Sequence, residues 1–140
     1  MKVLDPRRKY FVALFSACSL IFISSASAGS ITSVSEQQNG KIINVRLGAT
    51  LNISLHSTYW YFDSAKNVQQ IKESTVTPTL PGPSAPAGCQ HPGTGCGTVK
   101  WFYKATKKGI ATFTAMRTSC GEALSCTPAN SKFSVKFLVK

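Results

Sequence analysis

Apolar and polar side chains alternate along several short segments of this chain, which is the pattern of β-strands with one buried face. The pattern is clearest in 99–105 and again in 111–116, whose apolar positions are Val99, Trp101, Tyr103, Ala105, Ala111, Phe113 and Ala115. The residues between them, 106–109, end in a glycine that can adopt a positive φ. Because a short turn joins two amphipathic strands, we predict a β-hairpin here.

Further strands are predicted wherever a similar period or a strong strand propensity recurs, namely in 29–39 (ragged), 43–47, 51–56, 59–62, 68–76 (weak) and 133–139. The segments 43–47 and 51–56 could form either a hairpin or a corner at which the chain changes sheet. In the aromatic run 59–62, Trp60 or Tyr61 is expected to anchor the core.

Between residues 77 and 97 the chain holds five prolines and five glycines. This composition excludes a central strand and predicts a long loop, a type of segment that is usually functional when it is ordered. Five to seven short strands, turn-rich joints and no convincing helix together predict an all-β fold, a sandwich of immunoglobulin-like size.

The first 28 residues have the features of a secretory signal peptide. A basic start is followed by the apolar stretch 11–23 and by Ala26-Ser27-Ala28, a cleavage signal. We therefore expect export to the periplasm or medium after cleavage near Ala28, one mature domain over 29–140, and no transmembrane segment. Processing as a lipoprotein at Cys18 is the alternative.

Cleavage of this leader leaves four cysteines, Cys89, Cys96, Cys120 and Cys126. An even number in an exported chain indicates two disulfides. Of the three possible pairings we favour Cys89–Cys96 with Cys120–Cys126, because each pair brackets one loop between strands. Zinc bound by the cysteines and His91 is the competing interpretation, but there is no C-x-x-C pair, so no metal site is expected.

The chain is basic, with 16 Lys and Arg against five Asp and Glu. Its lysines are spread over alternate strand positions, such as Lys100, Lys104, Lys132 and Lys136. Dispersed charge of this kind is typical of a solvated face that keeps strand edges from pairing. A basic exported protein could also meet an acidic protein, a membrane surface or a polyanion. No specific nucleic-acid binding is predicted.

No catalytic set stands out in the sequence. After the leader the histidines are His56 and His91, and the few acidic residues are scattered, so no paired carboxylates are available for acid–base chemistry. A triad of His56, Ser57 and Asp63 is disfavoured because adjacent strand residues point to opposite faces. We therefore expect no enzyme and no cofactor, and we look for function in loops that join strands at one end of the sandwich.

Several segments resemble the chagasin family of cysteine-peptidase inhibitors, which have an immunoglobulin-like β-sandwich. The family's G-x-G-G loop, F-x-F-x-A strand and K-P-G turn are matched by Gly93-Thr94-Gly95-Cys96-Gly97, Trp101-Phe102-Tyr103-Lys104-Ala105 and Lys107-Lys108-Gly109. Upstream, Leu55-His56-Ser57-Thr58-Tyr59-Trp60 is similar to the family's N-P-T-T-G-Y-x-W loop. Two departures are Cys96, in place of a glycine, and Thr118-Ser119-Cys120, in place of a proline and an aromatic residue after Arg117.

The resemblance implies a monomeric inhibitor that wedges three loops into the cleft of a papain-type cysteine peptidase. The expected loop residues are Ser57, Thr58, Tyr59 and Trp60 in the first loop, Gly93, Thr94, Gly95 and Gly97 in the second, and Arg117, Thr118 and Ser119 in the third. By this resemblance Thr58 would approach the peptidase nucleophile, and the second loop would pair with the cleft edge. The alternative is a non-inhibitory exported module of the same fold that binds another protein or an anionic surface.

Overall fold

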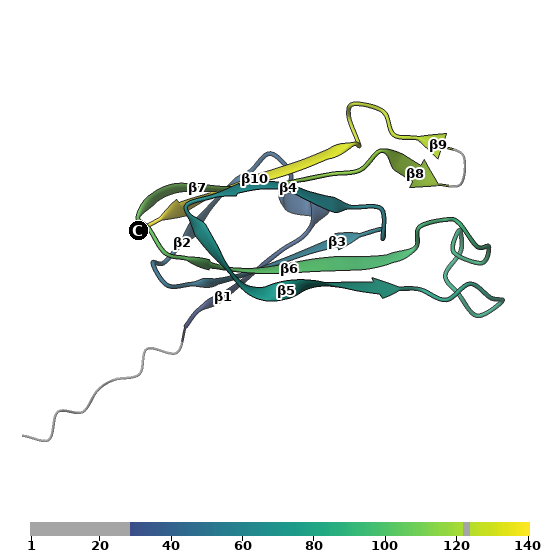
Figure 1. Ribbon diagram of the computed structural model, residues 1–140, viewed down its shortest axis with the longest axis horizontal. Helices are drawn as coiled ribbons and strands as arrows, with labels where there is room; N and C mark the ends of the chain where they lie inside the picture. Colours follow the sequence, from purple (N-terminus) through teal and green to yellow (C-terminus); the bar gives the residue numbers. More distant parts are fainter. Residues whose placement is uncertain (1–28, 122–123) are drawn as a thin grey trace, which may run out of the picture.

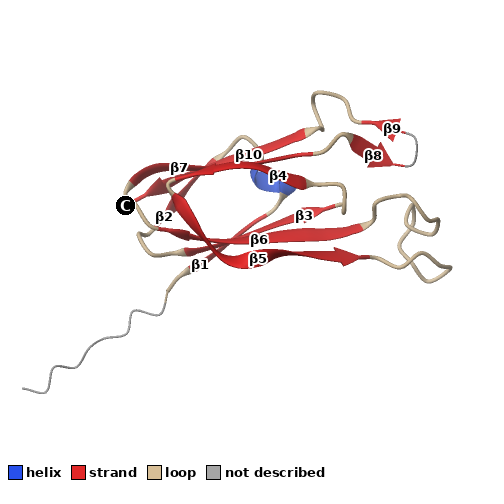
Figure 2. Cartoon of the chain, in the orientation of Figure 1, coloured by secondary structure: helices blue, strands red, loops and turns tan. Residues whose placement is uncertain are grey.

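The structure, a computed structural model, describes residues 29–121 and 124–140. The predicted leader, 1–28, lies outside the described residues and stays a prediction. The described residues form ten strands and one short 3₁₀ helix (Figures 1 and 2). In chain order these are β1 (Ile31–Val34), η1 (Glu36–Gln38), β2 (Ile42–Val45), β3 (Thr50–His56), β4 (Tyr61–Lys66), β5 (Val68–Pro78), β6 (Gly97–Ala105), β7 (Gly109–Met116), β8 (Ser119–Gly121), β9 (Leu124–Ser125) and β10 (Lys132–Val139).

Two four-stranded sheets pack face to face, with strand orders β1-β3-β6-β5 and β2-β10-β7-β4, and β8 and β9 form a separate two-stranded ribbon (Figure 1). The edge strands β1 and β2 pair in parallel with β3 and β10, whereas all other pairs are antiparallel. The predicted immunoglobulin-like β-sandwich is thereby confirmed.

The core lies between the inner faces of the two sheets and is built from the alternating apolar positions of β3, β6, β7 and β10. Phe113 is fully buried at its centre, with its ring centroid 5.3 Å from that of Trp101 and 5.6 Å from that of Tyr103. Of the two aromatic residues expected to anchor the core, Trp60 is buried and Tyr61 is exposed.

The predicted hairpin of 99–105 with 111–116 is wrong. Both segments are strands, but β6 pairs with β3 and β5, while β7 lies in the other sheet between β10 and β4. In a hairpin the large side chains of the two strands would lie side by side on one face and would not cover each other. Placing β6 and β7 in opposite sheets lets Trp101 and Tyr103 pack against Phe113 across the core.

The link between β2 and β3 is a corner at which the chain changes sheet, one of the two arrangements that the sequence allowed. Gly48 takes a φ of 83° there, and its amide donates a hydrogen bond to the Ala105 carbonyl. The amide of the preceding Leu47 donates to the Lys140 carbonyl at the end of β10. Adjacent residues of this corner therefore bond to opposite sheets.

The segment predicted as a weak strand, 68–76, is the longest strand of the fold. β5 runs for 11 residues along the edge of its sheet and ends at Pro78. Two irregularities interrupt its register with β6. Proline and irregular pairing are both compatible with an edge strand, where one row of backbone groups faces away from the sheet. The loop that follows is consequently 79–96.

Removing the central aromatic ring should test this packing most directly. Phe113→Ala is expected to lower the free energy of unfolding by about 3–5 kcal/mol, because it leaves a cavity among Trp101, Tyr103 and Phe133. Ile110→Ala, at an exposed position of the same strand, is the matched control and should cost far less. Urea denaturation measures both, and equal losses would contradict the core described here.

The burial of Tyr103 leads us to expect that the free energy of unfolding depends on pH. Burial raises the pKa of its phenol above the ordinary value of 10.0. The folded state therefore holds this proton more tightly than the unfolded state, so its contribution to stability is complete below pH 10.0 and is lost as the pH rises through the folded-state pKa. Denaturation between pH ~8 and ~11 should show a steeper loss for the wild type than for Tyr103→Phe. Parallel curves would contradict this, since lysine titration is common to both proteins.

Candidate functional site

The three loops singled out by the sequence lie at the same end of the sandwich, at the right of Figure 1. The first connects β3 to β4, the second connects β5 to β6, and the third follows β7 and contains the β8–β9 ribbon. We call this region the loop end and define it as residues 56–60, 79–97, 117–121 and 124–131. Residues from all three loops line one hollow of about 410 Å³, among them Ser57, Gly95 and Arg117.

The first and second loops are joined by backbone hydrogen bonds. The Ser57 amide donates to the Gly97 carbonyl and the Thr58 amide donates to the Gly95 carbonyl, each at 2.8 Å. Together they continue the pairing of β3 with β6 beyond the last residues of the sheet. The two loops therefore form a single unit rather than two independent segments.

Packing also requires glycine in the second loop. Gly95 has a φ of 66°, and a Cβ at this position would lie 2.2 Å from Cε2 of the Tyr59 ring. A Cβ on Gly97 would lie 2.7 Å from Cγ2 of Thr58. The Tyr59 hydroxyl donates to the Gly93 carbonyl and fixes the ring over this loop. Two of the glycines that the family resemblance singled out, Gly95 and Gly97, thus lie where the first loop packs closely against the second.

A disulfide holds the outer part of the second loop. Cys89 and Cys96 are bonded with their Cα atoms 5.7 Å apart, which is the pairing that the sequence favoured. The Thr79 amide donates to the Cys96 carbonyl at 3.0 Å, and the Thr94 hydroxyl donates to the His91 carbonyl at 3.1 Å. The disulfide and these bonds tie the two arms of the loop together at its base.

Arg117 connects the third loop to the first. Its guanidinium carbon lies 4.4 Å from the centroid of the Trp60 ring, a cation–π contact, and its Nε donates to the Asn130 carbonyl at 2.9 Å. Trp60 is buried, and its indole Nε1 donates to the His56 carbonyl at 3.1 Å. Both residues were predicted as contact residues; Trp60 is buried, whereas Arg117 is half-buried and lines the hollow.

The third loop is closed by the disulfide Cys120–Cys126, with Cα atoms 5.0 Å apart. It is a short ribbon in which Ser119 pairs with Ser125. Thr118 is exposed, and its carbonyl accepts a hydrogen bond from the Cys126 amide. This local pairing replaces the proline and aromatic residue of the resembled family with a stapled turn.

Ser57 adopts a backbone conformation that is rare for residues other than glycine, with a φ of 112°. Its hydroxyl accepts a hydrogen bond from the Tyr59 amide at 3.2 Å. Such a conformation costs about 1–3 kcal/mol and persists only where surrounding contacts enforce it. Here the hydrogen bonds between the first and second loops do so, at the position directly before Thr58.

Glu36 is a supporting residue that sequence reasoning missed. Its carboxylate, on the 3₁₀ helix η1, accepts a hydrogen bond from the His56 backbone amide, and Oε2 lies 3.1 Å from Nδ1 of the same histidine. This contact fixes the residue at which β3 ends and the first loop begins. Glu36 and His56 are 20 residues apart and belong to no common motif, so no local signal could have linked them.

Two exposed leucines at the loop end were also missed. Leu80 in the second loop is 80% exposed and Leu124 in β9 is 64% exposed. Leu80 precedes Pro81, which favours an extended backbone and projects the side chain from the loop. Both side chains offer apolar surface at the loop end that a binding partner could cover.

The described residues offer no conventional metal site or membrane span. No three His, Cys, Asp or Glu side chains within 29–121 and 124–140 are placed to hold a metal ion. In the same part of the chain, no helix has the length and apolar character needed to cross a membrane.

Comparisons with known proteins relate the chain to solved structures only. No family model matches it, and no curated protein matches it in sequence. The crystal structure of the cysteine protease inhibitor EhICP2 from Entamoeba histolytica matches with a TM-score of 0.57 and 13% identity, over 81% of this chain and 98% of that chain. The solution structure of amebosin matches with a TM-score of 0.52 and 16% identity, over 79% and 98%. At these identities the similarity shows a shared fold.

Gly95→Ala should show whether this position needs glycine because of the packing of the two loops and not only because of its positive φ. The new Cβ would collide with the Tyr59 ring, whereas Gly88→Ala, in the same loop and with a φ of 84°, meets nothing within 4 Å. Both variants strain the backbone, so we expect Gly95→Ala to cost about 1–3 kcal/mol more than Gly88→Ala in chemical denaturation. Amide exchange at Thr58 should rise only in Gly95→Ala. Equal effects of the two substitutions would argue against this packing.

Proposed function

We propose that this protein is a chagasin-like inhibitor of papain-type cysteine peptidases and that the loop end enters the peptidase cleft. The observation that carries the proposal is the junction of the first and second loops, because it joins the segment bearing Thr58 to the glycine-rich segment through the Ser57–Gly97 and Thr58–Gly95 hydrogen bonds. The fold shared with a cysteine protease inhibitor supports it. That neighbour is a cysteine protease inhibitor, and we propose no catalytic activity for this chain.

Preorganisation supports such a role. A loop that is already ordered loses less conformational entropy on binding than a flexible loop does. The second loop is held by the Cys89–Cys96 disulfide, and the first is held by Glu36 and by the second loop. These constraints order the first and second loops before any partner binds.

The charge distribution also favours insertion into a cleft. The loop end contains a single Lys or Arg residue, Arg117, out of the 16 in the chain. This guanidinium is placed over Trp60 and bonded to the Asn130 carbonyl, so its position is fixed. Charged groups are costly to desolvate in an interface core, and the scarcity of cationic side chains among the described residues of the loop end lowers that cost.

The structure refines the role of each loop in this proposal. Thr58, half-buried beside Gly97, would approach the peptidase nucleophile, and the second loop would lie along the cleft edge. Exposed Leu80 and Leu124 would fill apolar subsites on either side. Arg117 and Trp60 would act indirectly, by holding the third loop against the first.

A non-inhibitory module that binds another protein is the second candidate. The observation that favours it is the third loop, where the Cys120–Cys126 disulfide closes a short ribbon in place of the family's proline and aromatic residue. A peptidase cleft that requires an extended third loop would reject this shape. Export also stays a proposal, and it would supply the oxidising compartment that both disulfides need.

Titration against papain-type peptidases tests the proposed function. The wild type should inhibit with a dissociation constant well below micromolar, and Thr58→Ala should weaken inhibition about tenfold or more if this side chain reaches a buried position in the cleft. Thr106→Ala, at an exposed position in the link between β6 and β7, is the matched control and should inhibit like the wild type.

Both variants are compared by thermal unfolding, so that a folding defect is not mistaken for lost contact. The proposal fails if the folded wild-type protein does not inhibit at micromolar concentration, or if Thr58→Ala and Thr106→Ala inhibit equally. Assays use the lowest thiol concentration that keeps the peptidase active, because reduction of Cys89–Cys96 would loosen the second loop.

A further inference from the structure

The β2–β3, β4–β5 and β6–β7 links and the end of β10 lie at the end of the sandwich opposite the loop end, at the left of Figure 1. We call this the basic end and define it by six exposed cationic residues, Arg46, Lys66, Lys104, Lys107, Lys108 and Lys140. Arg46, Lys107 and Lys108 lie in the β2–β3 and β6–β7 links. The other three lie at or near strand ends: Lys66 is the last residue of β4, Lys104 is the next to last residue of β6, and Lys140 follows β10.

Hydrogen bonds show that these links are neighbours in space. The Leu47 amide donates to the Lys140 carbonyl at 2.9 Å, and the Gly48 amide donates to the Ala105 carbonyl at 2.7 Å. The side chain of Asn67 donates to the Ile110 carbonyl at 2.8 Å and ties the β4–β5 link to the start of β7. The cations therefore share one surface although they are up to 94 positions apart in the sequence.

No acidic side chain among the described residues lies at this end. Glu36 is paired with His56 at the loop end, and that is the only salt bridge within 29–121 and 124–140. Asp63 lies at the irregularity within β4, and Glu73 lies at an irregularity within β5, both along the sides of the sandwich. The six cationic side chains of the basic end thus have no acidic side chain beside them among the described residues, which creates a strong positive local field.

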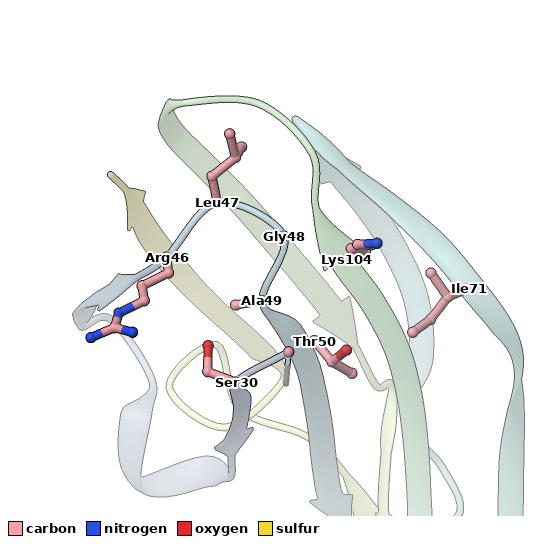
Figure 3. Close-up of a pocket in the computed structure, with 9 residues that line it drawn as sticks. Ser30, Arg46, Leu47, Gly48, Ala49, Thr50, Ile71 and Lys104 are labelled. Carbon is pink, nitrogen blue, oxygen red and sulfur yellow. The ribbon is translucent and has the colours of Figure 1, made fainter. Parts of the chain in front are cut away.

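Apolar side chains are interleaved with this charge. Leu47, Ile71 and Ile110 are 47%, 48% and 47% exposed. Leu47 extends outward from the corner between β2 and β3, as Figure 3 shows. Beside it a hollow of about 560 Å³ is lined by Arg46, Lys104 and Ile71 among others, with the two cationic side chains on opposite sides (Figure 3).

We infer that the basic end binds the surface of an anionic phospholipid bilayer. Its cations would lie over the phosphate groups, and Leu47 would reach into the interface between headgroups and acyl chains. Lysine and arginine near such a surface each strengthen binding, and exposed apolar side chains add to it. A nucleic acid or an acidic polysaccharide would satisfy the cations alone and leave the apolar side chains in water. This inference does not depend on the proposed peptidase inhibition.

Such binding would also orient the protein relative to the bilayer. The basic end and the loop end lie at opposite ends of the long axis of the sandwich (Figure 1). A protein held at a bilayer by the basic end would therefore present its three loops away from the lipid, where another macromolecule could reach them.

Co-sedimentation with vesicles tests the inference, with equimolar phosphatidylglycerol and phosphatidylcholine compared with phosphatidylcholine alone. The wild type should bind only the anionic vesicles, and binding should weaken as salt is added. Lys107→Gln with Lys108→Gln should reduce the partition coefficient about 25-fold, since each lysine near the surface contributes about fivefold. Lys100→Gln with Lys132→Gln removes the same charge from positions outside the basic end and serves as the control. All variants are compared in the same processed form and after a thermal unfolding check.

The variant Leu47→Ala distinguishes binding to a bilayer from binding to other polyanions. It should weaken vesicle binding about three- to tenfold through lost apolar burial, while leaving retention on heparin and on duplex DNA unchanged. The inference is overturned if the wild type does not bind anionic vesicles at low salt, or if the two lysine pairs lose equal affinity. It is also overturned if Leu47→Ala binds vesicles as the wild type does, because the surface would then be a general polyanion site.

Discussion

The packing of Phe113 against Trp101 and Tyr103 is the contact on which the rest of this structure depends. It joins the two sheets at their centre, where the ring centroids are 5.3 and 5.6 Å apart. Because β6 and β7 must face each other to make it, the link between them has to cross from one sheet to the other. That crossing, together with the corner at Gly48, gathers the cationic links at one end, and the longer loops occupy the other end.

Contacts among the three loops, and one from the neighbouring helix η1, hold the loop end in place. Glu36 fixes the end of β3, Arg117 lies over Trp60, and Gly95 lets the Tyr59 ring approach the second loop. None of these contacts needs a binding partner, so the surface is formed before any encounter. A strained Ser57 next to Thr58 is tolerated because the surrounding hydrogen bonds hold it. The arrangement suits an inhibitor or another rigid recognition module, and it places little charge at the contact.

The sequence alone was sufficient for most strands, for the fold class and for a disulfide pairing that the structure contains. Alternation of apolar residues is a local property, and it marked 43–47, 51–56, 99–105, 111–116 and 133–139 without reference to the rest of the chain. The same reasoning placed 68–76 as a weak strand, because its exposed face and irregular register weaken the alternation. The glycines of the second loop were found through a family resemblance, and the structure adds the reason that they must be glycine.

What the chain determined by itself is which residues are strands and which face of each strand is buried, since period and side-chain type depend only on neighbours in sequence. Which strands pair was decided by tertiary structure. Trp101 and Phe113 could be covered only from opposite sheets, so a short turn between two amphipathic strands became a crossing and not a hairpin. The supports of the loop end, Glu36 with His56 and Arg117 with Trp60, likewise exist only because folding brings distant segments together.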